Sequence, residues 1–486
     1  MVIPGLISRW VKRALDPDQM LISGMAGAID MAAVRYSLRD DPVRYRPGQP
    51  LKLLLPTYCG TRNTGADVRV SEIVRQLKQI LGEDNLELTL FTINPPLTAG
   101  YFRGVRQVEL PTIFPKFLYD ECPRHHGVVA AEGSMFKSKF SNALSTMLAG
   151  SLGLASLEGK LSVGYGGEAG AMDPSLEAFV RAQCRHSLII CRNRASESIL
   201  QGLGIRTAAG ADTAWTFEPA CPARGQQLLR DVGWDGHAPV VAMCPINPFW
   251  WPARPDLLKA AAHRLGGQYR DEHYKSIVFH SWSEEAAEKY DAYLDQMALA
   301  LEQHIGETGA FPVLMASERL DRLACEDLAA RLPFSPPMMV SDDHDMYDFV
   351  AALRQCSLVV ASRFHAIVNS MPAGVPSIGV TMDERIHNLF VDRGHEELLF
   401  QVDDADLGEG LVAAMRAVQR DSERYQRDIL AFVPGQIRLM GEMGIAFEDE
   451  LARVYPDFPR REVPRTWDRY LPALSPDLAR LLEEWA

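Results

Sequence analysis

Along most of the chain, short apolar runs alternate with amphipathic helical stretches. In the first half, the apolar runs predict strands at 51–55, 86–91, 127–131, 160–163 and 187–191, and helical periodicity predicts helices at 68–81, 174–184 and 195–202. Strands and helices that alternate in this way are typical of a parallel sheet covered on both faces. The pattern stops between Glu218 and His237, a stretch rich in Pro, Gly, Arg and Asp that is predicted to connect two domains.

The same alternation resumes after residue 238. Strands are expected at 240–244, 276–280, 311–315, 358–361 and 377–380, and helices at 284–302, 321–332, 346–356 and 365–371. We therefore predict an α/β protein with two Rossmann-like doubly wound domains, 51–220 and 238–430, that face a cleft. Helical extensions are predicted at 1–50 and 431–486. In such folds the ligand binds outside the carboxyl ends of the strands, between the domains.

The first residues carry an amphipathic pattern of their own. Apolar residues from Leu6 to Ala14 share one helical face, and basic residues from Arg9 to Arg13 lie on the other. The pattern fits a helix docked on its own domain, which we favour, and it also fits a helix at a membrane surface. A peripheral membrane contact through residues 4–15 therefore stays open as an alternative.

Composition narrows the environment and the partners. The chain has 486 residues and a formal net charge of −13, which opposes broad attraction to nucleic acid. Its eight cysteines contain no CxxC pair, which suits a reducing compartment and argues against a zinc cluster. Basic residues break the apolar start, so no signal peptide is expected, and the sequence has no apolar run of about 18 residues that could span a bilayer. We expect a cytoplasmic protein, membrane-peripheral at most, with no nucleic-acid partner.

The segment Ser362-Arg363-Phe364-His365 carries the densest chemical signal. It follows the predicted strand 358–361, and Ser362 is predicted to cap the helix that begins there. The free N–H groups and the dipole of a first helical turn favour an anion, and Arg363 adds a planar fork for bidentate contact. His365 can donate or accept a proton at the same ligand. In the alternative, Arg363 pairs with a structural carboxylate such as Asp383, and His365 only caps the turn.

Other polar residues are expected around the same crevice. A polar cluster follows the segment and comprises Asp383, Arg385, His387 and Asn388. His280 and Trp282 end a predicted strand, where they would form either a sugar platform or a packed core pair. The acidic run 342–345 is interpreted as a helix cap, so no metal site is expected.

These blocks resemble the polysaccharide pyruvyl transferase family. The run from Ser362 to Asn388 is similar to the family's Ser-Arg-hydrophobic-His segment, which is followed by Ala-Gly-Val-Pro and a charged stretch that leads to Asn-Leu. Residues 63–67 resemble its Asn-x-Gly-Asp loop, with Ala66 as an extra residue. The block around Arg192, the later Asp212 and the glycine-rich loop 164–168 agree in order, so the resemblance covers about residues 51–395.

The resemblance implies a glycosyltransferase-B-like fold and a phosphoenolpyruvate-dependent transferase that needs no cofactor. Phosphoenolpyruvate would be the donor, and a pyruvyl ketal on a glycan or lipid-linked sugar would be the product. His365 is expected to act as general acid/base, while Arg363 and Arg192 hold the phosphate and the carboxylate. Substrate contacts are assigned to Asn63, Asp67, Gly166, His280, Trp282, Ser362, Asp383 and Asn388.

Two other functions fit the same pattern. A nucleotide-sugar glycosyltransferase would use the helix N-terminus near Arg363 for a diphosphate. A catalytically silent carbohydrate-binding protein would keep the fold without binding a donor. The acceptor sugar, the stereochemistry of the ketal, the choice of pyruvate over another small acid and the oligomeric state stay open at this level.

Overall fold

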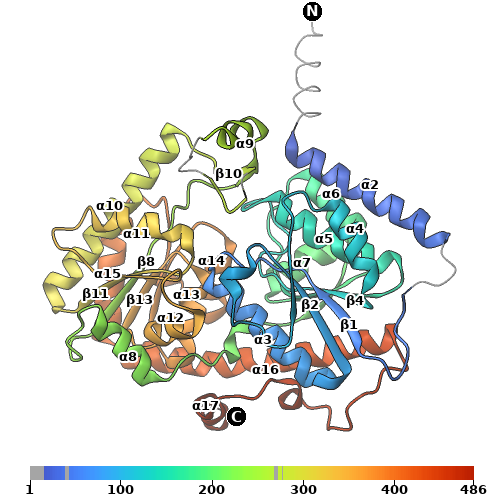
Figure 1. Cartoon of the computed structure of the whole chain (residues 1–486). Helices are drawn as coiled ribbons and strands as arrows, with labels where there is room; N and C mark the ends of the chain where they lie inside the picture. The colour runs from blue at the N-terminus through green and yellow to red at the C-terminus, as the bar shows by residue number, and fades with distance from the viewer. Residues whose placement is uncertain (1–15, 39–42, 267–271, 276, 486) are drawn as a thin grey trace, which may run out of the picture.

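The structure is a computed structural model that describes residues 16–38, 43–266, 272–275 and 277–485. Two sheets of parallel strands lie side by side, and helices cover both faces of each sheet (Figure 1). The predicted α/β class with two doubly wound units is therefore confirmed.

The first sheet has seven strands in the order β3-β2-β1-β4-β5-β6-β7. They are β1 Leu51–Leu55, β2 Leu86–Thr92, β3 Arg106–Glu109, β4 Gly127–Ala130, β5 Leu161–Gly167, β6 Leu188–Cys191 and β7 Arg206–Ala209. Its helices are α3 Thr64–Leu81, α4 Pro115–Glu121, α5 Asn142–Leu157, α6 Pro174–Gln183 and α7 Arg194–Gly202. Every residue of β4, β5 and β6 is buried, which explains why β4 and β6 have no charged or polar side chain.

The second sheet has six strands in the order β12-β11-β8-β13-β14-β15. They are β8 Val240–Cys244, β11 Phe311–Ala316, β12 Met338–Val340, β13 Leu358–Ala361, β14 Ser377–Thr381 and β15 Leu399–Gln401. Its helices are α8 Pro222–Asp231, α10 Glu284–Thr308, α11 Arg322–Ala329, α12 Met346–Leu353, α13 Phe364–Ser370, α14 Glu384–Arg393 and α15 Leu407–Arg420. The chain order reverses between β1 and β4 in one sheet and between β8 and β13 in the other, and such reversals are where doubly wound sheets bind ligands.

Several elements differ from the sequence prediction or were not predicted, and three of them are instructive. The strand expected at 276–280 is only β10 Val278–Phe279, which pairs antiparallel with β9 Arg254–Pro255 outside the main sheet. A short apolar run in the sequence does not reveal whether the strand joins the main sheet or pairs outside it. The expected connection Glu218–His237 contains helix α8, because its proline begins a helix and Gly225 lets that helix approach the backbone of Ala351. Helix α5 was missed because it is apolar and buried on most sides, so its sequence has little amphipathic period.

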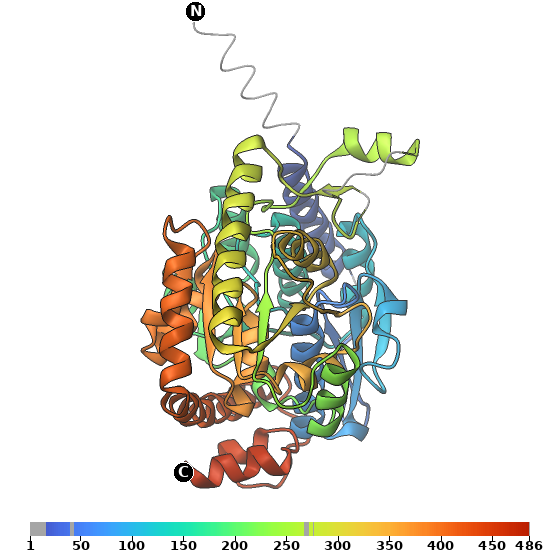
Figure 2. The same ribbon diagram turned by 90° about the vertical axis from the view of Figure 1, so that its left-hand side faces the viewer.

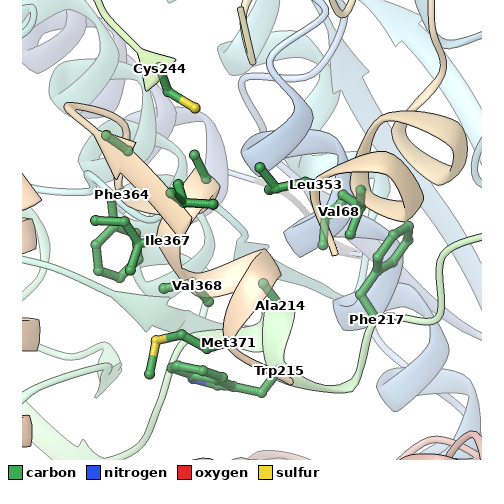
Figure 3. Close-up of a cluster of buried hydrophobic side chains, with 14 of the residues drawn as sticks. Val68, Ala214, Trp215, Phe217, Cys244, Leu353, Phe364, Ile367, Val368 and Met371 are labelled. Carbon is green, nitrogen blue, oxygen red and sulfur yellow. The ribbon is translucent and has the colours of Figure 1, made fainter. Parts of the chain in front are cut away.

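Apolar packing joins the two halves of the molecule. Val68 of α3 lies beside Leu353 of α12, and Trp215 lies beside Met371, which with Ile367 follows β13 (Figure 3). All five side chains belong to one continuous hydrophobic core that includes both sheets. The relative position of the halves is thus set by a packed core, and so is the geometry of any site between them.

Two helical additions complete the fold. Helix α16 Ser422–Val454 runs beneath both sheets and contacts β5 and β7 of the first half and the 3-10 turn Met371–Ala373 of the second (Figure 1). The C-terminal helical extension therefore begins earlier than the predicted residue 431. Helix α2 Pro17–Ser37 packs on α5, and it lies with α9 Leu257–Arg264 and β10 at the end of the molecule opposite to α17 Pro476–Glu484 (Figures 1 and 2).

The amphipathic pattern of residues 4–15 lies outside the described residues. Within the described part of the chain, no helix combines the length and apolarity that crossing a membrane requires.

Candidate functional site

The two points of strand-order reversal open into one cavity. The loop after β1 contributes Tyr58 and Asn63, the loop after β4 contributes Glu132, the chain after β8 contributes Trp251, and Arg363 follows β13. The cavity between the halves has a volume of about 150 Å³. Because the carboxyl ends of both sheets converge on it, it is the place where a two-domain fold of this kind binds a ligand.

Arg363 forms part of the cavity wall, as the sequence predicted, but carboxylates already hold it. Its Nε lies 2.8 Å from Asp321 Oδ2 and its Nη2 lies 2.5 Å from Glu318 Oε2. The alternative partner named from the sequence, Asp383, was therefore wrong, although an ion pair with a buried carboxylate does exist. Burial raises the pKa of Asp321, and Arg363 opposes that rise. The two carboxylates thus fix the position of the Arg363 guanidinium, and a ligand anion would have to share the guanidinium with them.

Ser362 does not cap the following helix. Arg363 occupies the N-cap position of α13 without a capping side-chain bond, and the buried Ser362 hydroxyl lies 2.9 Å from the Tyr293 hydroxyl instead. The predicted cap was wrong by one residue, because the chain bends at Ser362 and Arg363 is still extended, so the helix begins only at Phe364.

His365 meets an aspartate from the other half of the molecule. Its Nε2 lies 3.4 Å from Asp212 Oδ2, at the long end of hydrogen-bond geometry. Asp212 is buried and also lies 3.0 Å from both Arg192 Nη1 and Arg69 Nε. Burial lowers the pKa of His365, and Asp212 opposes the shift. The imidazole is therefore held between the halves beside a carboxylate that stabilises its protonated form.

Arg192 lies behind the cavity wall. Its guanidinium contacts Glu168 and Asp212, and it stacks over the Phe364 ring at 4.4 Å from the centroid. The structure thus brings Arg192 to His365 through Asp212, as predicted for partners across the cleft. It does not place Arg192 among the described residues that line the cavity, so this guanidinium is placed to orient the His365–Asp212 pair.

A second ionic cluster crosses between the halves at α14. The buried Lys137 Nζ lies 3.1 Å from Glu168 and 3.0 Å from Glu384, with Asp383 at 3.8 Å. Asp383 caps α14 and binds Arg385 Nε at 2.7 Å, and Arg385 lines the cavity. The predicted ligand contact Asp383 therefore supports Arg385.

Asn388 lies one turn further along α14 than Arg385. Among the described residues, its buried Nδ2 atom has no hydrogen-bond partner. Asn388 is not one of the described cavity-lining residues, so the structure separates it from the crevice to which the sequence assigned it.

The loop residues of the first half take different positions. Asn63 caps α3 by accepting a hydrogen bond from Ala66 N at 3.1 Å, and it lines the cavity. Asp67 lies one turn further and is buried, and burial raises its pKa to about 7. Gly166 has a φ of 64° and its carbonyl accepts from Arg69 Nη2 at 2.8 Å. Asn63 is thus at the wall, while Asp67 and Gly166 support the layer behind it.

His280 and Trp282 do not form a platform together. His280 is buried and stacks on Trp250 with ring centroids 4.1 Å apart, whereas the Trp282 side chain is 54% exposed. The packed-core reading of His280 is confirmed, with Trp250 as its partner. The pair with Trp282 was wrong because the chain after β10 is irregular and turns the two side chains to different environments.

Sequence reasoning missed a row of hydrogen-bonded rings at the cavity. The Tyr58 hydroxyl lies 3.1 Å from His273 Nε2, and His273 Nδ1 lies 3.2 Å from His280 Nε2. Burial lowers the pKa of His273 to about 4 and that of His280 to about 2, so both imidazoles are neutral at neutral pH. The position of Tyr58 just after β1 was a usable signal, but nothing in the sequence around His273 marks it.

Among residues 16–38, 43–266, 272–275 and 277–485, no group of three His, Cys, Asp or Glu side chains is placed to hold a metal ion.

Two Rossmann-like halves that share a cavity at both reversal points define the class of protein, a two-domain fold of the glycosyltransferase-B type. Residues 173–384 match the family model of polysaccharide pyruvyl transferase, so the resemblance found in the sequence is confirmed there, and with it the transferase class. The matched segment contains Arg192, Asp212, Arg363 and His365. No curated protein matches the chain.

Among the solved structures that match, one shows the same fold, and a second is less similar. The Anabaena protein HepE in complex with UDP-glucose has 11% identity and a TM-score of 0.51, and the match covers 82% of this chain and 100% of that chain. The UDP-GlcNAc 2-epimerase from Neisseria meningitidis bound to UDP-GlcNAc has 8% identity and a TM-score of 0.48, with 78% and 94% covered. At 11% identity, the likeness to HepE shows the fold alone.

Proposed function

We propose that this protein transfers a pyruvyl group from phosphoenolpyruvate to a sugar in the cavity between its halves and closes it to a ketal. The family match supports the transferase class. The observation that carries the proposal is the convergence of Arg363, at the cavity wall, with the His365–Asp212 pair two residues further on. Arg363 is one of the described residues that line the cavity and His365 is not, so contact of His365 with the ligand is part of the proposal, which rests on the two side chains being neighbours where the strand order reverses.

Donor binding is proposed to use Arg363 as the principal cation. Phosphoenolpyruvate carries a phosphate and a carboxylate, and both suit the guanidinium fork. Glu318 and Asp321 now occupy that fork, so the donor must displace one of them. Because burial already favours the protonated form of Asp321, we expect Asp321 to take up a proton as the donor binds. Lys275 and Arg385 also line the cavity and can contact the second anionic group.

Proton transfer is assigned to His365. Because burial lowers the pKa of His365, the step starts from the neutral imidazole, which takes the proton of the first sugar hydroxyl as that oxygen bonds to C2, and the imidazolium so formed protonates C3 of the enolpyruvyl group. The C2–O bond to phosphate then breaks, the second hydroxyl oxygen bonds to C2, and its proton leaves on inorganic phosphate. Asp212 stabilises the imidazolium form, while Arg192 and Arg69 keep Asp212 ionised and in place.

A calorimetric titration of phosphoenolpyruvate tests the donor assignment. Wild type is expected to bind, Arg363→Lys to bind weakly because it loses the bidentate fork, and Arg363→Ala not to bind. Arg322→Ala is the matched control, because Arg322 is the next residue after Asp321 but pairs with Asp343 at 3.0 Å on the surface. His365→Ala should bind the donor and release no phosphate. Absence of binding to wild type would refute the donor assignment, and release of a nucleotide from a nucleotide sugar would favour a glycosyltransferase instead.

A further inference from the structure

An apolar groove of about 700 Å³ lies beside the cavity, along helix α2. Met20, Leu21 and Met31 of α2 line it, together with Ile113 from the chain before α4 and Ile277 from the chain before β10. Of the residues that line it in the described part of the chain, Lys116 alone carries a charge, and it pairs with Asp120 at 2.5 Å. The groove is therefore lined mostly by apolar side chains.

The groove is continuous with the cavity. Thr112, Ala143 and Val278 line both spaces, so a ligand can extend from one into the other without leaving the protein surface. Helix α2 and the β9–β10 excursion, which border the groove, lie at the same end of the molecule in both views (Figures 1 and 2).

Several groove side chains are exposed to water although they are apolar. Ile113 is 72% exposed, Met31 is 61% exposed and Met20 is 54% exposed. A contiguous exposed apolar surface of this kind often marks a binding site. Methionine side chains are flexible and polarizable, so they adapt to a ligand that has no fixed shape.

We propose that the groove binds the hydrocarbon chain of a lipid-linked sugar, whose sugar end lies in the cavity. The placement of the sugar in the cavity rests on the proposed function, whereas binding of the hydrocarbon chain in the groove can be tested without any donor. A peptide would bring backbone N–H and C=O groups that need hydrogen-bond partners, and an apolar lining leaves such groups costly to bury. A hydrocarbon chain needs no such partners and is stabilised by every methylene that leaves water.

Chain-length dependence of binding is the measurement that tests the groove. Hexyl, octyl and decyl β-glucosides are titrated calorimetrically into the full-length protein below their micelle-forming concentrations and without phosphoenolpyruvate. If the chain enters the groove, each added methylene should tighten the dissociation constant by up to about fourfold. The perturbing variant is Gly24→Glu, which places a carboxylate on the groove side of α2.

The control variant is Gly27→Glu on the same helix. Neither glycine has a neighbouring atom within 4 Å of an added Cβ, but only Gly24 is one of the groove residues. Both changes replace a helical glycine, so both proteins should fold at least as well as wild type. The expected result is a chain-length dependence that is lost in Gly24→Glu and kept in Gly27→Glu.

Three results would overturn the proposal. The first is an affinity that does not depend on chain length in wild type, and the second is equal loss in both glycine variants. The third result uses the full-length double variant Leu6→Ser/Trp10→Ser, which removes two apolar side chains near the N-terminus. If affinity depends on chain length only in this variant, then the chain's own N-terminal segment occupies the groove in wild type. Separate titration with phosphoenolpyruvate shows whether the donor assignment stands or fails independently.

Discussion

The substitution Gly65→Ala tests whether the position of His365 matters for the reaction. Gly65 lies in the first turn of α3, directly against the imidazole. An added Cβ would lie 2.2 Å from His365 Nδ1 and 2.6 Å from His365 Cβ, where ordinary contacts exceed 3.4 Å. His365 would therefore have to move by about 1 Å, and a displacement of that size at a reacting group can lower turnover about 100-fold.

The effect on stability should be much smaller than the effect on turnover. Alanine is favoured over glycine in a helix interior by about 1 kcal/mol. Overpacking costs about 1–3 kcal/mol, so the free energy of unfolding should fall by about 2 kcal/mol or less. The Asp212 contact, already 3.4 Å long, has little reserve against such a shift.

Two assays on one variant separate these effects. Turnover is measured as phosphate released from phosphoenolpyruvate with a mixed pool of glycan acceptors, and stability by urea denaturation. Gly435→Ala in α16 is the control, because an added Cβ there meets nothing within 4 Å. If Gly65→Ala unfolds like wild type and also turns over like wild type, the assignment of His365 as proton carrier held by Asp212 is wrong.

Two further predictions concern buried carboxyl groups. Burial raises the pKa of Asp67 to about 7, so the folded state holds this proton more tightly than the unfolded state, and the free energy of unfolding should fall as the pH rises through 7. Urea denaturation between pH 5 and 8 should show a smaller fall for Asp67→Asn than for wild type. Parallel curves for the two proteins would contradict this prediction. Because donor binding is expected to protonate Asp321, phosphoenolpyruvate affinity in calorimetry should weaken with rising pH more steeply for wild type than for Asp321→Asn. The ligand's own titration is common to both proteins, so equal slopes would exclude a role for Asp321.

Much of the site's outline could be predicted from the sequence. Buried parallel strands are continuous apolar runs, so their carboxyl ends can be located along the chain, and ligands bind there. This reasoning placed Asn63 and Arg363 correctly at the cavity wall. The predicted strand at 276–280 was wrong, because so short an apolar run does not reveal whether it will pair within the main sheet.

Pairings between distant residues could not be predicted in the same way. Tyr58 and His273 are 215 residues apart and meet only because the chain after β8 folds back over the loop after β1. The same holds for the carboxylates Glu318 and Asp321, which decide whether Arg363 is free or held.

The sequence by itself determined the α/β class, the family resemblance and the Arg363–His365 segment, because all three depend on local patterns of apolar and functional side chains. Only the tertiary structure decided that Arg192 lies behind the wall, that Asp212 reaches His365 from the other half, and that an apolar groove opens beside the cavity. The physical reason is that burial and ion pairing depend on which surfaces meet when the two halves share one core, and a linear pattern does not specify that contact.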